Sequence, residues 1–128
     1  MMKDMAAKIS DSELEVLSVL WDADRPLPLA QIRDEVERTH CWDGSTIKTL
    51  VRRLCEKGAV EAEKREVYYY RPLISRREYS NWSTQNLIDR IFQGSAKQMV
   101  ASLVETEQLT DLDIQELREL LERGGRHE

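Results

Sequence analysis

Apolar residues recur at helical spacing in the first quarter of the chain. Leu14, Leu17 and Trp21 lie three or four residues apart, so they share one face of a helix. A Ser-x-x-Glu pattern at 10–13 is typical of a capping box, in which each side chain satisfies a free backbone N–H of the other residue. The Pro-Leu-Pro run at 26–28 cannot continue a helix. We therefore expect a first helix from about residue 10 to 23, followed by a short extended connector.

Two more helices are predicted after this connector. Pro28 suits the first turn of a second helix that runs to about Arg38. A polar break then leads to a third helix over 44–57, with Asp43 as its N-cap and Gly58 at the position where a glycine commonly ends a helix. The apolar positions of the third helix share one face: Ile47, Leu50, Val51 and Leu54.

The apolar pattern changes after Gly58 from helical spacing to strand-like alternation. Residues 59–64 alternate apolar and acidic side chains, and residues 67–71 contain three consecutive tyrosines, which favour a strand. Residues 64–66 form a short loop between the two strands, so a hairpin is expected. Tyr69 is expected on one face of the hairpin, with Tyr68 and Tyr70 on the other. Three helices and a hairpin predict a winged helix-turn-helix domain over 8–73.

The rest of the chain, residues 74–124, predicts three helices. The first covers about 75–92, the second is capped by Ser95, and the third begins at a capping box formed by Thr110 and Asp113. The fold class is therefore mainly α with a small β-hairpin, a winged helix-turn-helix followed by a three-helix region. That region carries more large apolar side chains than short helices can bury alone: Trp82, Leu87, Ile91, Phe92, Leu103, Leu117 and Leu121. We expect them to form a homodimer interface; packing onto the winged helix is the alternative.

Composition narrows the class of protein. The 128 residues suit one ordinary domain, or a small domain with an appendage. No stretch is apolar enough to span a membrane, and no secretion signal precedes Ser10, so a cytoplasmic protein is expected. Neither a glycine-rich phosphate loop nor a hydrolase or zinc-protease motif occurs, and His40 and His127 are far apart. The sequence therefore predicts no enzyme, no metal site and no cofactor.

The net charge of −5 argues at first against a nucleic-acid partner. The acidic excess is uneven, because residues 1–79 carry 14 basic and 15 acidic side chains and residues 80–128 carry 5 and 9. Within 48–57 there are four cations and one anion. On a helical wheel of roughly 100° per residue, the face opposite the apolar stripe of the third helix carries one acid, Glu56, among hydroxyl and cationic side chains: Ser45, Thr46, Lys48, Thr49, Arg52 and Arg53.

This mixture is typical of a recognition helix in the major groove of double-stranded DNA. Lys57 and Arg65 are further candidates for phosphate contacts, and the indole of Trp42 either packs over the third helix or donates to a phosphate. Glu61, Glu63 and Glu66 surround the hairpin cations, so strong binding by the wing is not assured. A winged-helix adaptor that binds protein instead of DNA is the alternative. A thiol sensor using Cys41 or Cys55 is a further hypothesis.

Several segments resemble the penicillinase-repressor family. These are residues 9–16 and 19–21, residues 42–43, 46–50, 53–54 and 57–59, and the hairpin exit at 68–70, 72–75 and 78–79. The resemblance implies a homodimeric transcriptional repressor on a palindromic promoter operator. It places Trp42, Ser45, Thr46, Lys48, Thr49 and Arg53 at DNA-contacting positions.

The chain departs from the family at two places. Asp43–Gly44 replaces a common Ser-Pro, and Ser102–Leu103 stands where some members have the Asn-Phe bond cut by a regulatory protease. A protease is therefore an open partner, and cleavage near Ser102–Leu103 is in question. The C-terminal cysteine cluster of copper-responsive members is absent from the sequence, which disfavours copper sensing.

Overall fold

The computed structural model describes residues 2–124, with side chains from Asp4 onwards. Contacts divide the chain into two units between Ser83 and Thr84, inside the long helix α5 (Arg76–Ile91). The sequence placed the end of the winged helix at residue 73, and that division stays a prediction. His127 lies outside the described residues. Among residues 2–124, no helix is long and apolar enough to cross a membrane, and no three metal-ligating side chains lie together.

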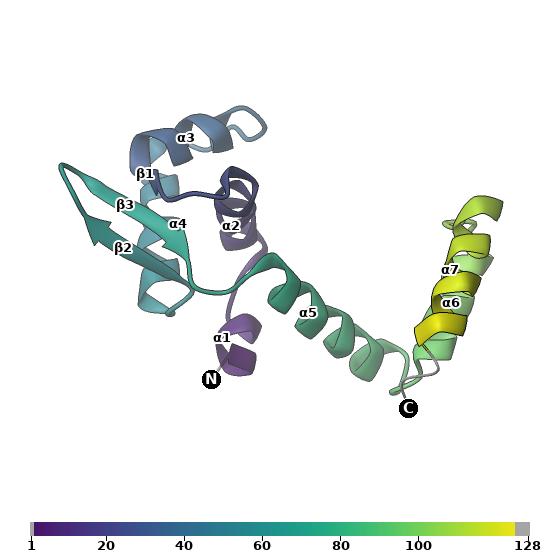
Figure 1. Cartoon of the computed structure of the whole chain (residues 1–128). Helices are drawn as coiled ribbons and strands as arrows, with labels where there is room; N and C mark the ends of the chain where they lie inside the picture. The colour runs from purple at the N-terminus through teal and green to yellow at the C-terminus, as the bar shows by residue number, and fades with distance from the viewer. Residues whose placement is uncertain (1, 125–128) are drawn as a thin grey trace. The chain divides into compact units, whose positions relative to one another are not determined.

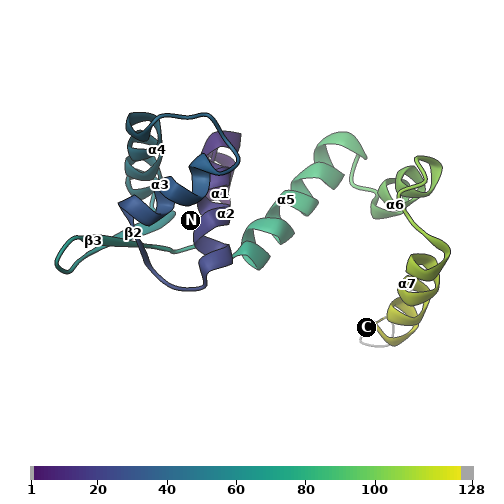
Figure 2. The same cartoon turned by 90° about the horizontal axis from the view of Figure 1, so that it is seen from above.

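Three helices form the centre of the N-terminal unit. They are α2 (Asp11–Ala23), α3 (Leu29–Glu37) and α4 (Gly44–Glu56), which Figure 2 shows from above. All three begin within one residue of their predicted starts. The capping box is present, because Ser10 and Glu13 exchange hydrogen bonds of 2.9 and 3.2 Å. The helices meet over a core whose largest fully buried apolar side chains are Leu17, Leu20, Ile32, Ile47, Leu54 and Ile74.

A three-stranded antiparallel sheet completes the winged helix. Its order is β1 (Leu27–Pro28), β3 (Tyr68–Pro72), β2 (Val60–Lys64), so the predicted hairpin gains a third strand (Figure 1). Leu27 pairs with Tyr70 and lies 2% exposed. The segment that the sequence predicted as a plain connector is therefore an edge strand, a position where a proline without an N–H is tolerated.

A short helix at the N-terminus, α1 (Met2–Ala7), was not predicted. Ala6 and Ile9 are buried against the core, and Met5 packs beside them. Six residues are too few for a helical repeat to be read from the sequence, and an isolated helix of this length is not stable. Tertiary packing therefore stabilises α1.

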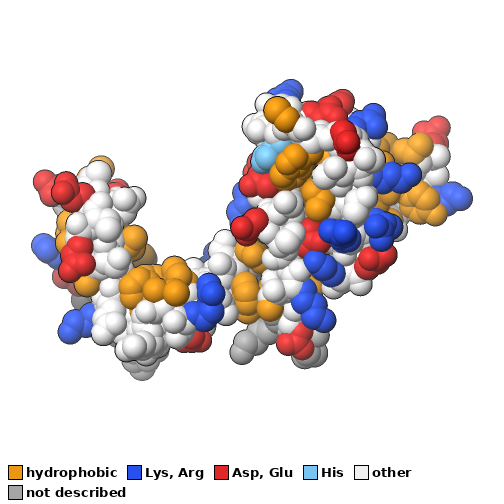
Figure 3. All heavy atoms as spheres, turned by 180° about the vertical axis from the view of Figure 1, so that it is seen from behind, with side chains coloured by type: hydrophobic (Ala, Val, Ile, Leu, Met, Phe, Trp, Pro, Cys, Tyr) orange, Lys and Arg blue, Asp and Glu red, His pale blue; other side chains and the backbone are white. Residues whose placement is uncertain are grey.

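The C-terminal unit contains the end of α5, α6 (Ala96–Glu105) and α7 (Asp111–Gly124). The predicted caps are present: Ser95 accepts from the N–H of Gln98, and Thr110 and Asp113 exchange two hydrogen bonds of 3.0 Å. Of the described residues after Ile88, none is buried. Apolar side chains of this unit therefore lie at its surface, as Figure 3 shows.

Trp82, which the sequence assigned to a dimer interface, is half-buried and packs within the N-terminal unit. Its ring lies 5.8 Å from Tyr79, whose ring lies 6.1 Å from Trp21, and all three pack against the core of the winged helix. The indole N–H of Trp21 donates to the carbonyl of Ile74 at 2.9 Å. Sequence spacing showed that Trp82 is on the apolar face of α5, but not that the first half of this helix belongs to the N-terminal unit.

Candidate nucleic-acid interface

Both ends of α4 are fixed by local hydrogen bonds. At its start the carboxylate of Asp43 accepts from the backbone N–H of Thr46 at 2.9 Å and from the hydroxyl of Ser45 at 2.8 Å. Both bonds lower the pKa of Asp43, and the bond from the Thr46 N–H has the larger effect. At its end Gly58 has φ of 81°, and the N–H groups of Gly58 and Ala59 donate to the carbonyls of Cys55 and Leu54. This is the Schellman arrangement, which favours glycine.

The two long faces of α4 have opposite chemistry. Its apolar face is anchored in the core, since Ile47, Leu50, Val51 and Leu54 are all buried. The opposite face meets solvent. Its exposed members are Ser45, Thr46, Lys48, Arg52 and Arg53, and Thr49 is half-buried among them. We call these six residues the α4 outer face. It has the predicted composition and lies open on a helix that the core holds in place.

Lys57 differs from the sequence expectation. Its ammonium lies 2.6 and 2.8 Å from the two carboxylate oxygens of Glu13 and donates to the carbonyl of Lys8 at 2.7 Å. The three donors of the ammonium therefore have three partners inside the protein, and Lys57 does not belong to the α4 outer face. The sequence analysis made Lys57 a candidate for a phosphate contact because it is a cation next to the third helix. Its observed partner, Glu13, lies 44 residues earlier in the chain.

Trp42 lies in the loop before α4 and is half-buried. Its ring is 4.3 Å from that of His40, and it packs against the core. The imidazole of His40 lies 3.7 Å from Glu15 and 2.8 Å from the hydroxyl of Thr39. These contacts fit a packing role for Trp42, and its contact with a phosphate stays a prediction.

The wing carries cations that already have partners. The guanidinium of Arg65 lies 3.1 Å from Glu63 and 4.6 Å from the ring of Tyr69. Arg71 pairs with Glu61 in the same hairpin. These exposed pairs reduce the positive potential of the wing, as its acidic neighbours suggested.

A cavity of about 490 Å³ lies between α4 and the sheet. Lys48, Arg52 and Cys55 line it from α4, and Tyr68 and Tyr70 line it from β3, so the predicted alternation of the tyrosines is confirmed. Burial, together with Glu56, raises the pKa of the Cys55 thiol, which lowers its reactivity at neutral pH. Cys41 is exposed; both cysteines are free. Tyr68, which the sequence did not assign to the interface, is half exposed beside the α4 outer face.

The candidate dimer residues other than Trp82 lie at the surface of the C-terminal unit. Phe92 is half-buried, whereas Leu87, Ile91, Leu103, Leu117 and Leu121 are exposed. A groove of about 430 Å³ runs between α6 and α7, with Arg118 and Glu122 at its edge. Its apolar lining includes four residues that the sequence prediction left out. Val100 and Val104 lie in α6, Ile114 lies in α7, and Leu109 lies in the loop between these helices.

Comparison with known proteins gives a consistent result. The penicillinase repressor of Bacillus licheniformis is 33% identical over 116 residues, which are 90% of each chain. The methicillin resistance regulatory protein MecI of Mammaliicoccus sciuri is 28% identical over 95% of this chain and 99% of its own.

A solved structure and a family profile agree with these relatives. The solution structure of monomeric Bacillus licheniformis BlaI in complex with the blaP half-operator has a TM-score of 0.50 and 36% identity over 56% of this chain and 88% of that one. The sequence profile of the penicillinase repressor family matches residues 9–123. This chain therefore belongs to the penicillinase repressor family.

Proposed function

We propose that this protein is a transcriptional repressor that binds double-stranded DNA with α4 in the major groove. The observation that carries the proposal is the α4 outer face, a solvent-exposed row of hydroxyl and cationic side chains on a helix whose opposite face is buried. The DNA complex of the related BlaI structure supports it. We propose the cytoplasm as its location, because the related repressors come from bacteria, whose promoters are in that compartment.

The side chains of the α4 outer face suit different parts of DNA. Arg52 and Arg53 have the planar guanidinium that reaches guanine edges or phosphates, and Lys48 is a point charge for phosphate. Ser45 and Thr46 lie at the positive N-terminal end of the helix, where a phosphate oxygen would compete with the carboxylate of Asp43 for the Ser45 hydroxyl and the Thr46 N–H. Arg65 is a further candidate from the wing, if DNA displaces its pairing with Glu63.

We further propose that two copies bind a palindromic operator. The exposed apolar groove between α6 and α7 supports a second copy as its cover, because large contiguous apolar surfaces are rare on monomers. A twofold pair would present two copies of α4 to two half-sites on one side of the duplex. The acidic excess of residues 80–128 would then lie in the region that does not contact DNA.

A regulatory protease acting near Ser102–Leu103 is a separate proposal. This bond lies inside α6, where the carbonyl of Ser102 accepts from the N–H and the hydroxyl of Thr106 at 3.0 and 2.9 Å. Cleavage would require local unwinding of α6. The absence of buried residues in this helix supports a low cost of unwinding.

A gel-shift experiment tests the DNA proposal against the adaptor alternative. The probe is the duplex upstream of the protein's own gene, with an excess of random duplex as competitor. We expect a retained complex that dissociates as salt rises, because phosphate neutralisation releases counterions. If random duplex displaces the probe as well as unlabelled probe does, or if no complex forms at low salt, the result would contradict the proposal and favour the adaptor.

The same experiment tests the thiol-sensor hypothesis. Peroxide treatment that leaves the complex unchanged would remove this hypothesis.

A further inference from the structure

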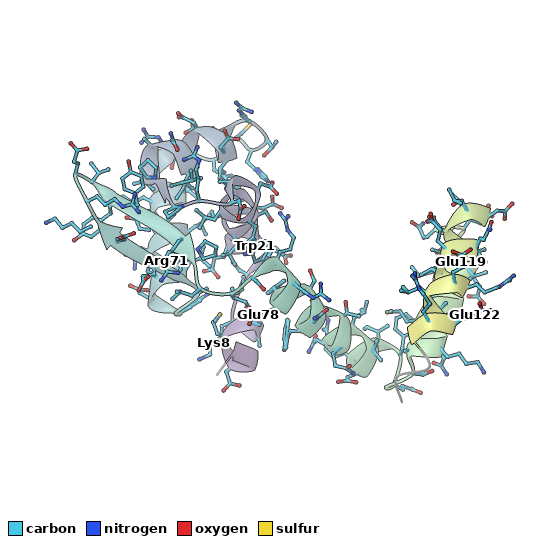
Figure 4. The ribbon with its side chains drawn as sticks, viewed as in Figure 1. Lys8, Trp21, Arg71, Glu78, Glu119 and Glu122 are labelled. Carbon is cyan, nitrogen blue, oxygen red and sulfur yellow. The ribbon has the colours of Figure 1, made fainter. Side chains whose placement is uncertain are left out.

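The C-terminal end of α4 is joined to the start of α2 by a buried ion pair. Lys57 is the residue that immediately follows α4, and Glu13 lies in the first turn of α2. Glu13 is 1% exposed, and the side chain of Lys57 is 27% exposed. The same ammonium also bonds to the carbonyl of Lys8, which is labelled in Figure 4. One cation therefore connects α4 to both the α1–α2 corner and α2.

Every polar atom of this pair has a partner. One carboxylate oxygen of Glu13 accepts from the N–H of Ser10 as well as from Lys57, and the other accepts from Lys57 alone. Within the described chain, no buried side-chain nitrogen or oxygen lacks a hydrogen-bond partner. Burial by itself would raise the pKa of Glu13, but the bonds from Lys57 and Ser10 outweigh it and lower the pKa, so the carboxyl of Glu13 is ionised at neutral pH.

The geometry of this pair restricts α4 in a way that apolar contacts do not. Burial of the apolar face of α4 is favourable in any arrangement that removes it from water, because the hydrophobic effect is not directional. Hydrogen bonds weaken steeply when their angles change. Three bonds at one end of α4 therefore oppose rotation of the helix about its axis and movement along it.

Such a restriction matters more for base contacts than for phosphate contacts. Side chains that read base edges require matched donor and acceptor positions, whereas attraction to phosphates acts at longer range and does not depend on sequence. A buried ion pair is in general weak evidence for stability, because desolvation offsets much of its attraction. We therefore consider the effect of the Lys57–Glu13 pair on the position of α4 and not its effect on stability.

We propose that Lys57 and Glu13 are positioning residues for α4, which set the preference of the protein for its operator over random DNA without contacting DNA. This role rests on the proposed function of the α4 outer face, although Lys57 and Glu13 both lie outside that face. It also predicts that Lys57, although it is a cation beside the recognition helix, neutralises no phosphate and therefore causes no release of a counterion from the DNA.

The test compares binding of two probes by purified full-length variants. The operator probe is the duplex that the wild-type protein selects from a random pool, and the second probe is a random duplex of the same length. Lys57→Met removes the ammonium, and the double variant Glu13→Leu, Lys57→Met replaces the pair by apolar side chains of similar size, a change that proteins often tolerate. Arg76→Met is the matched control, because Arg76 forms an exposed pair with Asp22 at 2.6 Å in the same unit.

We expect both variants to bind the operator roughly tenfold more weakly and random duplex within about twofold of wild type. The slope of log affinity against log salt should stay unchanged, whereas loss of one phosphate contact lowers it by about one. The control should behave as wild type with both probes. Circular dichroism establishes that each variant is folded at the temperature of the measurement.

Three results would overturn the proposal. Equal weakening with both probes and a reduced salt slope would make Lys57 a phosphate contact. Wild-type discrimination in the folded double variant would make the pair irrelevant to α4 placement. Failure of the double variant to fold would make the pair a requirement of the whole fold. If the wild-type protein selects no sequence at all, it is the proposed function that fails.

Discussion

Arg52 and Arg53 are neighbours in the sequence, but they have different surroundings at the scale of single residues. Arg52 forms an ion pair with Glu56 one turn later, at 3.0 Å. Arg53 is exposed and has no ion-pair partner within the described residues. Glu56 competes with DNA for the guanidinium of Arg52, whereas Arg53 is available without a rearrangement. Arg53 is therefore the better candidate for a direct base contact.

We expect Arg53→Ala to weaken operator binding by about 1–3 kcal/mol, the usual range for a bidentate contact with a base. Fluorescence anisotropy with a labelled operator measures the effect. Arg77→Ala, which removes an exposed cation from α5, is the matched control and should bind as wild type. An unchanged affinity of the Arg53 variant would show that this side chain does not contact the operator.

Glu13 predicts a pH dependence of stability whose sign follows from its lowered pKa. A carboxyl whose pKa is lower when folded stabilises the protein above the ordinary pKa of glutamate, about 4.3. That stabilisation is lost as the pH falls through the folded value. At pH 7, Glu13→Gln should reduce the free energy of unfolding by about 3 kcal/mol.

Urea denaturation of wild type and Glu13→Gln at a fixed protein concentration checks this prediction. The difference between the two should be constant above about pH 5 and should shrink at lower pH. A difference that grows as the pH falls would contradict the assignment. Lys57→Met should also show a difference from wild type that shrinks as the pH falls, because protonation removes the unpaired buried charge of Glu13.

At the scale of elements, sequence signals that act locally predicted the structure well. The caps at Ser10, Asp43, Ser95 and Thr110 each start a helix where the sequence placed it, because a cap and its N–H lie within three residues. Features that depend on residues far away in the sequence could not be predicted from the sequence pattern. The strand at Leu27–Pro28 exists because Tyr70 lies beside it, and Lys57 has its observed role because Glu13 lies 44 residues earlier.

The end of α4 offers a test of such a local signal. Gly58 has φ of 81°, and a Cβ added there would meet no atom within 4 Å. Gly58→Ala should therefore cost only the strain of a left-handed backbone, about 1–2 kcal/mol. Gly58→Asn is the matched control and should cost less, because asparagine tolerates this conformation better. An equal loss of unfolding free energy for both variants in urea denaturation would mean that lack of room for a side chain, and not backbone strain, causes the loss.

At the scale of the whole molecule, the two units differ in how they are stabilised. The N-terminal unit has a continuous apolar core, whereas α6 and α7 bury no residue within the described chain. The sequence predicted the surplus of apolar side chains but not which half of α5 belongs to which unit. Helical spacing defines a face, but only tertiary packing shows what that face contacts.

Replacement of Leu117 and Leu121 by Asp tests the proposed second copy. Both leucines line the groove between α6 and α7, and two carboxylates there would oppose an apolar interface. We expect monomers in sedimentation velocity where the wild type sediments as a dimer. Replacement of Glu116 and Glu119 by Gln on the same helix is the control and should leave the dimer intact. A dimer that survives the leucine changes would place the interface elsewhere.

The central claim is that the α4 outer face lies against DNA, and an NMR titration of the full chain with its selected operator duplex tests it most directly. We expect the largest amide shifts along α4, from Ser45 to Arg53, and at the tip of the wing near Arg65. Amides of α7 should keep their positions. Unperturbed α4 amides in a saturated complex, with shifts confined to other elements, would contradict the account.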